Sequence, residues 1–314
     1  MSGKKSYIRL LFIAVFTLLF SFKAFAITVG FAQIGAESSW RTAETQSIKE
    51  EAQKRGYTLK FSDAQQKQEN QIKAIRSFIA QGVDAIILAP VVETGWERVL
   101  REAKKAKIPV ILVDRGIAVD DDSLYYTKVA SDFIFEGRLA GSWLAQALHG
   151  QGKVVELQGS TGASAAIDRQ KGFKEVVDLF PKLNIIATQN GEFTRTKGKE
   201  VMEAFLKAHG NNIDAVYAHN DDMALGAIQA IKDFGMVPGE DIKLISVDAV
   251  KGAFEAMIDG DLNATVECNP LLGPLAFDQV ELALAGKEAP KWVVQDDLIH
   301  LRENAKETVA SRKY

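Results

Sequence analysis

Charged and aromatic side chains follow short apolar runs at several points of this sequence. In the stretch "IPVILVDRGI" an apolar segment leads directly into Asp114 and Arg115. A carboxylate accepts hydrogen bonds and a guanidinium group donates them, so such a pair can bind hydroxyl groups, which do both. The alternative interpretation is a surface ion pair, which contributes little to stability.

The same placement recurs along the chain. Ten polar or aromatic residues at such positions are candidate ligand-binding residues: Glu37, Ser38, Trp40, Arg41, Asp114, Arg115, Arg169, Phe193, Asn220 and Asp248. Carboxylates, arginines and an amide suit a neutral polyhydroxylated ligand, and the apolar face of a sugar packs on an aromatic ring.

Several of these residues also have an ordinary structural interpretation. Asn220 can cap a helix, with Asp221 and Asp222 placed favourably in its first turn. Trp40 and Phe193 can fill the core, and Arg169 can lie on a solvated helix face. We expect Asn220 both to cap the helix and to bind the ligand.

An alternation of strand and helix patterns must position these residues. In the first half, strand patterns at 27–34, 57–63, 83–90 and 108–114 alternate with helical patterns at 39–56, 69–82 and 95–107. The second half repeats this with strand patterns at 152–159, 183–190, 213–220 and 241–249, separated by helical segments. The alternation predicts an α/β fold of two doubly wound parallel-sheet lobes, with ligands outside the carboxyl ends of the strands.

The chain is expected to cross between the lobes near Ser131, Cys268 and Val294, which predicts a multi-strand hinge. The predicted amino-terminal lobe consists of residues 27–131 plus 268–293, and the carboxy-terminal lobe of 132–267 plus 294–314. Cys268 is the single cysteine, so an intrachain disulfide is excluded.

Residues 1–26 have the features of a signal peptide. Basic residues precede the apolar run "LLFIAVFTLLF", and Ala24 and Ala26 have the spacing of a cleavage site. We predict cleavage after Ala26 and export to the periplasm. The remaining 288 residues carry 34 Lys and Arg against 41 Asp and Glu, a net charge of −7, because all four basic residues and no acid of the first 26 are lost. This balance is unfavourable for nucleic-acid binding.

Longer stretches carry a family resemblance. "VDAIILAPV", "IPVILVDRGI", "AHNDDMALGAIQAIKDFG" and "EFTRTKG" resemble the periplasmic sugar-binding proteins of ABC transporters, in the ribose-binding-like class. "QQKQENQIKAIRSF", "ELQGSTGASAAIDRQKGF" and "YAHNDDM" are most similar to the galactofuranose-binding branch. The resemblance covers nearly all of 27–290 and implies the type I periplasmic binding protein fold.

The resemblance also implies roles for the candidate residues. Those of the first lobe line the ligand, Arg169, Asn220 and Asp248 close on it from the second lobe, and Phe193 stacks opposite Trp40. Two positions depart from the family pattern, Ser39 in place of glycine and Phe133 in place of asparagine. Glu267 is a further candidate near the second crossing.

The resulting hypothesis is a non-enzymatic, monomeric periplasmic receptor that binds a monosaccharide, galactofuranose in the first instance, and delivers it to a membrane ABC permease. Ribose or galactopyranose is the alternative ligand, and delivery to a chemoreceptor is an additional role that the sequence leaves open. A carbohydrate-active enzyme is less favoured, because the hydrolase, metalloprotease and phosphate-loop motifs are missing. No cofactor or metal is expected; a metal site at His219, Asp221 and Asp222 is the disfavoured alternative.

Overall fold

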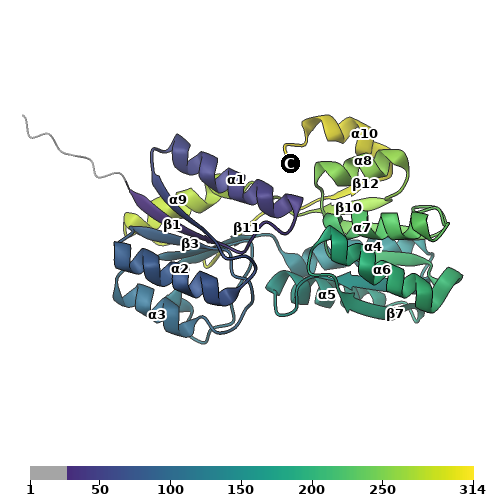
Figure 1. Ribbon diagram of the computed structural model, residues 1–314, viewed down its shortest axis with the longest axis horizontal. Helices are drawn as coiled ribbons and strands as arrows, with labels where there is room; N and C mark the ends of the chain where they lie inside the picture. Colours follow the sequence, from purple (N-terminus) through teal and green to yellow (C-terminus); the bar gives the residue numbers. More distant parts are fainter. Residues whose placement is uncertain (1–26) are drawn as a thin grey trace, which may run out of the picture.

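The computed structural model describes residues 27–314 as two lobes that lie side by side (Figure 1). The predicted signal peptide and its cleavage site lie outside the described residues. The helices of residues 27–314 are too short or too polar to cross a membrane.

The first lobe is built on one parallel sheet. In spatial order its strands are β11 (Trp292–Val294), β5 (Thr127–Ala130), β4 (Val110–Val113), β3 (Ala85–Leu88), β1 (Thr28–Gln33) and β2 (Thr58–Asp63). Its helices are α1 (Ser39–Lys54), α2 (Gln68–Gln81), α3 (Glu97–Lys105) and α9 (Gly273–Leu284). All residues of β3 and β4 are buried, as expected for central strands with helices on both faces.

The second lobe repeats this plan. Its strands, in spatial order, are β12 (Ile299–Leu301), β10 (Ala264–Glu267), β9 (Lys243–Asp248), β8 (Ala215–Ala218), β6 (Gln151–Gln158) and β7 (Lys182–Asn190). Only β12 is antiparallel to its neighbour in this part of the described chain. The helices are α4 (Phe133–Ala147), α5 (Ser164–Val177), α6 (Arg195–His209), α7 (Asp221–Asp233), α8 (Lys251–Asp259) and α10 (Arg302–Thr308).

Three crossing segments form the hinge and are bonded to one another. The Gln295 amide donates to the Ala130 carbonyl at 3.2 Å, and the Gln295 side chain donates to the Asn269 carbonyl at 2.9 Å. The Ser131 hydroxyl donates to Asp297 Oδ1 at 3.0 Å. The predicted α/β class with two doubly wound lobes and a multi-strand hinge is therefore confirmed. The exact lobe boundaries stay a prediction.

Candidate ligand-binding site

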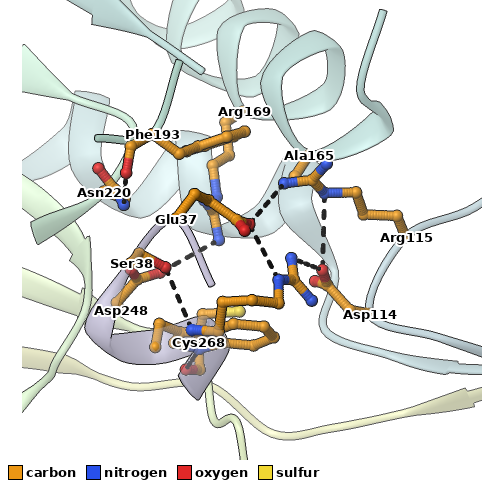
Figure 2. A pocket seen from close by; sticks show the side chains of 12 residues that line it. Glu37, Ser38, Asp114, Arg115, Ala165, Arg169, Phe193, Asn220, Asp248 and Cys268 are labelled. Carbon is orange, nitrogen blue, oxygen red and sulfur yellow. Dashed lines mark hydrogen bonds and ion pairs between the residues drawn. The ribbon is translucent and has the colours of Figure 1, made fainter. Parts of the chain in front are cut away.

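A small cavity lies between the lobes, and the empty space of about 290 Å³ around it includes some that is open to solvent. Figure 2 shows the side chains that surround it. The residues that line it are Glu37, Ser38, Trp40, Arg41, Asp114, Arg115, Ala165, Arg169, Phe193, Asn220, Asp248 and Cys268. All ten residues that the sequence predicts for the site are brought together in this one cavity.

The lining side chains come from the carboxyl ends of strands in both sheets. In the first lobe, Glu37 to Arg41 follow β1 and begin α1, and Asp114 follows β4. In the second lobe, Asn220 follows β8 and Asp248 ends β9. Because the strand ends of both lobes face the same space, the fold itself brings residues about 200 positions apart into contact.

Arg41 is the centre of the charge network of the first lobe. Its Nε lies 3.0 Å from Glu37 Oε1, its Nη1 2.5 Å from Glu44 Oε2 and its Nη2 2.6 Å from Asp114 Oδ2. Burial alone would lower the pKa of Arg41, but the three carboxylates outweigh it and raise the pKa. The nearest partner of Asp114 is thus Arg41 rather than the adjacent Arg115, whose Nε is 3.6 Å away.

Arg115 is buried with part of its donor capacity unused. Its Nη1 donates to the Val91 carbonyl at 3.2 Å, and its guanidinium lies 5.0 Å from the centre of the Phe193 ring. Burial and the nearby Arg41 lower the pKa of Arg115 to about 10. Within residues 27–314, neither Arg115 Nε nor Glu37 Oε2 has a hydrogen-bond partner. A buried donor and a buried acceptor are therefore available to a ligand.

Arg169 has the corresponding place in the second lobe. Its Nε lies 2.6 Å from Glu136 Oε2, its Nη1 donates to the His219 carbonyl at 2.7 Å, and its Nη2 lies 3.8 Å from Asp248 Oδ1. The helices α4 and α5 approach closely enough to form the Glu136 pair because position 172 is glycine: a Cβ there would lie 2.0 Å from the Ile134 carbonyl oxygen.

Burial raises the pKa of Asp248 well above its ordinary value, and the positive charge of Arg169 acts in the opposite direction. Burial also raises the pKa of Glu136, again against the effect of Arg169. Arg169 is therefore the group that favours the ionised form of both buried carboxyls.

Asn220 links the start of α7 to the loop that carries Phe193. Its Oδ1 accepts from the Met223 amide at 3.0 Å, which is the expected N-cap, and its Nδ2 donates to the Phe193 carbonyl at 3.1 Å. The Phe193 ring lies directly on Gly159, where a Cβ would be 1.9 Å from Cζ of the ring. A side chain at 159 would thus displace the ring.

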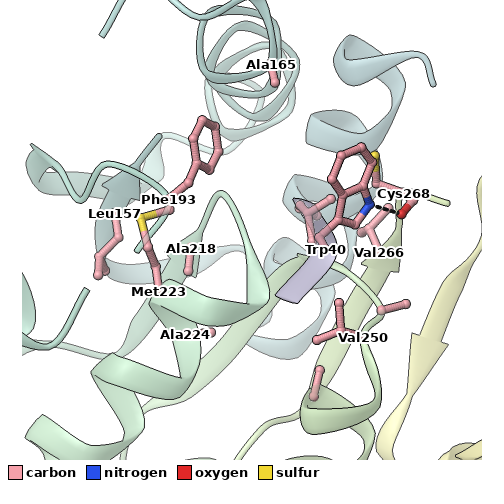
Figure 3. Close-up of a cluster of buried hydrophobic side chains, with 14 of the residues drawn as sticks. Trp40, Leu157, Ala165, Phe193, Ala218, Met223, Ala224, Val250, Val266 and Cys268 are labelled. Carbon is pink, nitrogen blue, oxygen red and sulfur yellow. Dashed lines mark hydrogen bonds between the residues drawn. The ribbon is translucent and has the colours of Figure 1, made fainter. Parts of the chain in front are cut away.

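Two aromatic rings face the cavity from opposite lobes. Trp40 and Phe193 are each 4% exposed, and Figure 3 shows them on opposite sides of the space between the lobes. The indole Nε1 of Trp40 donates to the Cys268 carbonyl at 2.5 Å, which fixes the ring against the hinge. The arrangement fits a flat ligand with two apolar faces and a polar edge.

Three lining residues have a left-handed backbone. The φ angles are 61° at Asp114, 60° at Phe193 and 122° at Asp248, and none of these residues is glycine. Such conformations cost about 1–3 kcal/mol each and persist where the surrounding structure imposes them, often at functional sites. The strain therefore supports the assignment of these strand ends to a binding site.

Sequence reasoning missed Glu44, Glu136 and the cavity-lining Cys268 and Ala165. Glu44 lies three residues after Arg41 on a helix, so the helical spacing could have revealed it. Glu136 pairs with Arg169 because α4 packs on α5, and no sequence spacing indicates which residues of two different helices will lie side by side.

One expectation needs correction, and a second, the first-turn position of Asp221 in α7, is confirmed but incomplete. Glu267 is not among the lining residues; its carboxylate instead accepts from His300 Nε2 at 3.1 Å, Arg312 Nη1 at 2.9 Å and the Tyr314 hydroxyl at 2.8 Å. Asp221 is a buried acceptor for the Val250 amide at 2.8 Å and for the Ser246 and Thr265 hydroxyls, rather than only a first-turn acid.

The disfavoured metal site has no support in the geometry. His219 Nε2 lies 3.0 Å from Glu156 Oε1, so this histidine is paired with Glu156 rather than with Asp221 or Asp222. In the described part of the chain, no three His, Cys, Asp or Glu side chains gather as metal ligands.

Two parallel-sheet lobes that enclose a polar cavity at their hinged junction define a type I binding protein. The chain belongs to the periplasmic binding protein family, whose domain matches residues 29–288. It is 54% identical over 311 residues to the galactofuranose-binding protein YtfQ of Escherichia coli, covering 97% of this chain and 98% of that protein.

Solved structures show the same relationship. The binding protein of the arabinose ABC transporter from Shewanella sp. ANA-3, bound to L-arabinofuranose, is 57% identical with a TM-score of 0.89, covering 91% of this chain and 95% of that one. A protein from Mycobacterium smegmatis in complex with β-D-fucofuranose is 51% identical with a TM-score of 0.90, covering 92% and 96%.

Proposed function

We propose that this protein is a transport receptor that binds a monosaccharide in its furanose form, with galactofuranose as the first candidate, and delivers it to an ABC importer. The observation that carries the proposal is the composition of the cavity. Three carboxylates (Glu37, Asp114, Asp248) and three guanidinium groups (Arg41, Arg115, Arg169) line it together with two aromatic rings. Hydrogen-bond acceptors and donors placed side by side suit a neutral ligand with many hydroxyl groups, each of which both donates and accepts.

The ligands named for the similar proteins support a single sugar unit. The sugars named for the similar proteins share one ring, because fucofuranose is deoxygenated galactofuranose and L-arabinofuranose is the same ring with a shorter side arm. We propose that the ten lining residues predicted from the sequence contact the bound sugar.

A panel of D-galactose, L-arabinose and D-ribose tests the proposal. The correct sugar raises the melting temperature in a concentration-dependent way, because it binds only the folded state. With ¹³C-labelled D-galactose, the chemical shift of the bound anomeric carbon distinguishes furanose from pyranose. Absence of any shift in melting temperature with all three sugars would refute the proposal.

The same experiment separates a receptor from an enzyme. A receptor returns the sugar unchanged after long incubation, whereas a carbohydrate-active enzyme yields a new product. We propose the non-enzymatic role because the similar proteins are named as binding proteins.

Location and assembly belong to the same proposal. A periplasmic, monomeric receptor would carry Ile27 at its amino terminus after removal of residues 1–26. Mass spectrometry of the periplasmic protein and its elution volume in gel filtration test both points.

A further inference from the structure

A hydrogen-bonded contact with a carboxylate acceptor joins the two lobes outside the cavity. Asp222 Oδ2, at the start of α7, accepts from the Ser39 amide at 2.8 Å and from the Ser39 hydroxyl at 2.7 Å. These residues are 183 positions apart and belong to different lobes. Within residues 27–314 neither of them is among those that line the cavity.

The helix geometry explains why an acid binds here. Ser39 is the first residue of α1, whose first turn contains no acidic side chain of its own. The first amide groups of a helix have no partner inside it and carry partial positive charge. Asp222 also lies in the first turn of α7. Its carboxylate is therefore held between two helix amino termini that come from opposite lobes.

The carboxylate is oriented by its own lobe. Arg195, the first residue of α6, lies 3.3 Å from Asp222 Oδ1 through Nε and 3.0 Å through Nη2. The Asp222 side chain is 8% exposed and Arg195 is 58% exposed. Because Arg195 and Asp222 belong to the same lobe, their pairing does not require the lobes to meet, and closure adds only the two donors of Ser39.

Two other contacts between the lobes are electrically neutral. The Glu93 amide donates to the Gly162 carbonyl at 2.9 Å, and the Gly116 amide donates to the Ser164 hydroxyl at 2.9 Å. Hydrogen bonds to an ionised acceptor are about twice as strong as neutral ones. The contact of Asp222 with Ser39 is thus the stronger type of closing contact.

We infer that Asp222 and Ser39 form a latch that holds the lobes closed over the bound ligand and sets its release rate without touching it. This inference rests on the proposed sugar-binding function. The latch forms only when the lobes meet, so it stabilises the closed complex and leaves the first encounter with the ligand unaffected.

Stopped-flow kinetics of Asp222→Ala and Ser39→Ala test the latch, with L-arabinose and D-galactose as probes and tryptophan fluorescence as the signal. Dissociation should be faster by about tenfold in Asp222→Ala, which loses both interlobe bonds to a charged acceptor, and by about threefold in Ser39→Ala, which keeps the amide donor. Association rates should stay at the wild-type value.

Two control variants are matched to these changes. Thr42→Ala removes an exposed hydroxyl of α1 that donates to the carbonyl of Ser38, the N-cap of the same helix, at 3.1 Å. Glu303→Ala removes an exposed first-turn acid of α10 in the second lobe. Both should release sugar at the wild-type rate. Dissociation at the wild-type rate in Asp222→Ala and Ser39→Ala would overturn the latch, as would an equal acceleration in the controls.

A ligand-free measurement separates the latch from the proposed function. If the wild-type protein binds none of D-galactose, L-arabinose and D-ribose, the proposed function has failed, and the latch is judged from spin labels at the exposed positions Lys73 and Glu203, one in each lobe. Asp222→Ala should then have a smaller fraction of short interlobe distances than wild type. Identical distance distributions would overturn the latch in that case.

Discussion

Glu37→Gln is the substitution that most directly tests the polar chemistry of the cavity. Glu37 Oε1 accepts from Arg41 Nε at 3.0 Å, whereas Oε2 is buried and has no hydrogen-bond partner in residues 27–314. Glutamine has the same shape and can keep its carbonyl oxygen toward Arg41. Its amide nitrogen then takes the place of the unpaired Oε2, so a group that could accept from a ligand hydroxyl becomes a donor.

The expected loss follows from one hydrogen bond to a charged group. Such a bond contributes about 1.5–3 kcal/mol. Affinity should therefore fall by about 10- to 150-fold. The stability of the ligand-free protein should fall by less than the binding free energy, because Arg41 keeps Glu44 at 2.5 Å and Asp114 at 2.6 Å as partners.

Titration calorimetry with L-arabinose and D-galactose measures the affinity, and a thermal melt of the ligand-free protein measures the stability. Glu51→Gln is the matched control. Glu51 pairs with Arg55 four residues later at 2.7 Å, as Glu37 pairs with Arg41, but Glu51 does not line the cavity. An affinity of Glu37→Gln within threefold of wild type would refute the role of Oε2. If the melting temperature of ligand-free Glu37→Gln falls together with the affinity, Glu37 stabilises the fold rather than binding the ligand.

Three further predictions concern other parts of the molecule. Trp40→Ala should weaken sugar binding by about 1–3 kcal/mol in calorimetry, because a buried aromatic surface is lost; unchanged affinity would disprove the stacking role. Gly159→Ala should weaken binding by forcing the Phe193 ring out of place, and a crystal structure with an unmoved ring would contradict this. Burial raises the pKa of Asp297 from 3.8 to about 8, so its neutral form favours the folded state below pH about 4 and this stabilisation is lost as the pH rises to about 8. The urea midpoint of the wild-type protein should fall between pH about 4 and about 8, and that of Asp297→Asn should fall less. If the midpoints of both proteins change with pH in parallel, Asp297 is not the source of the pH dependence.

The fold was predictable because its signals are local. Strand patterns such as that at 108–114 and helical patterns such as that at 69–82 are repeated often enough to define two sheets, and parallel sheets then place their strand ends at one cleft. Asp114, Asn220 and Asp248 could be assigned to the site for this reason alone.

The partners of these residues were less predictable, because they depend on packing between distant segments. The sequence neighbours Asp114 and Arg115 suggested a pair, but Arg41 on α1 takes the closest position to Asp114. Asp222 looked like an ordinary first-turn acid, and only the closed arrangement of the lobes places it on Ser39. Contacts of this kind have no periodicity that a single sequence could display.

The left-handed backbone at Asp114, Phe193 and Asp248 also constrains how ligand selectivity can be redesigned. Asparagine and glycine tolerate positive φ angles, whereas valine, isoleucine and threonine are strained there. Mutant libraries that randomise these three codons would therefore contain many poorly folded members. Ala165 also lines the cavity, and it lies in the first turn of α5 with an uncharged side chain, so a search for receptors with a new sugar preference should vary that position first.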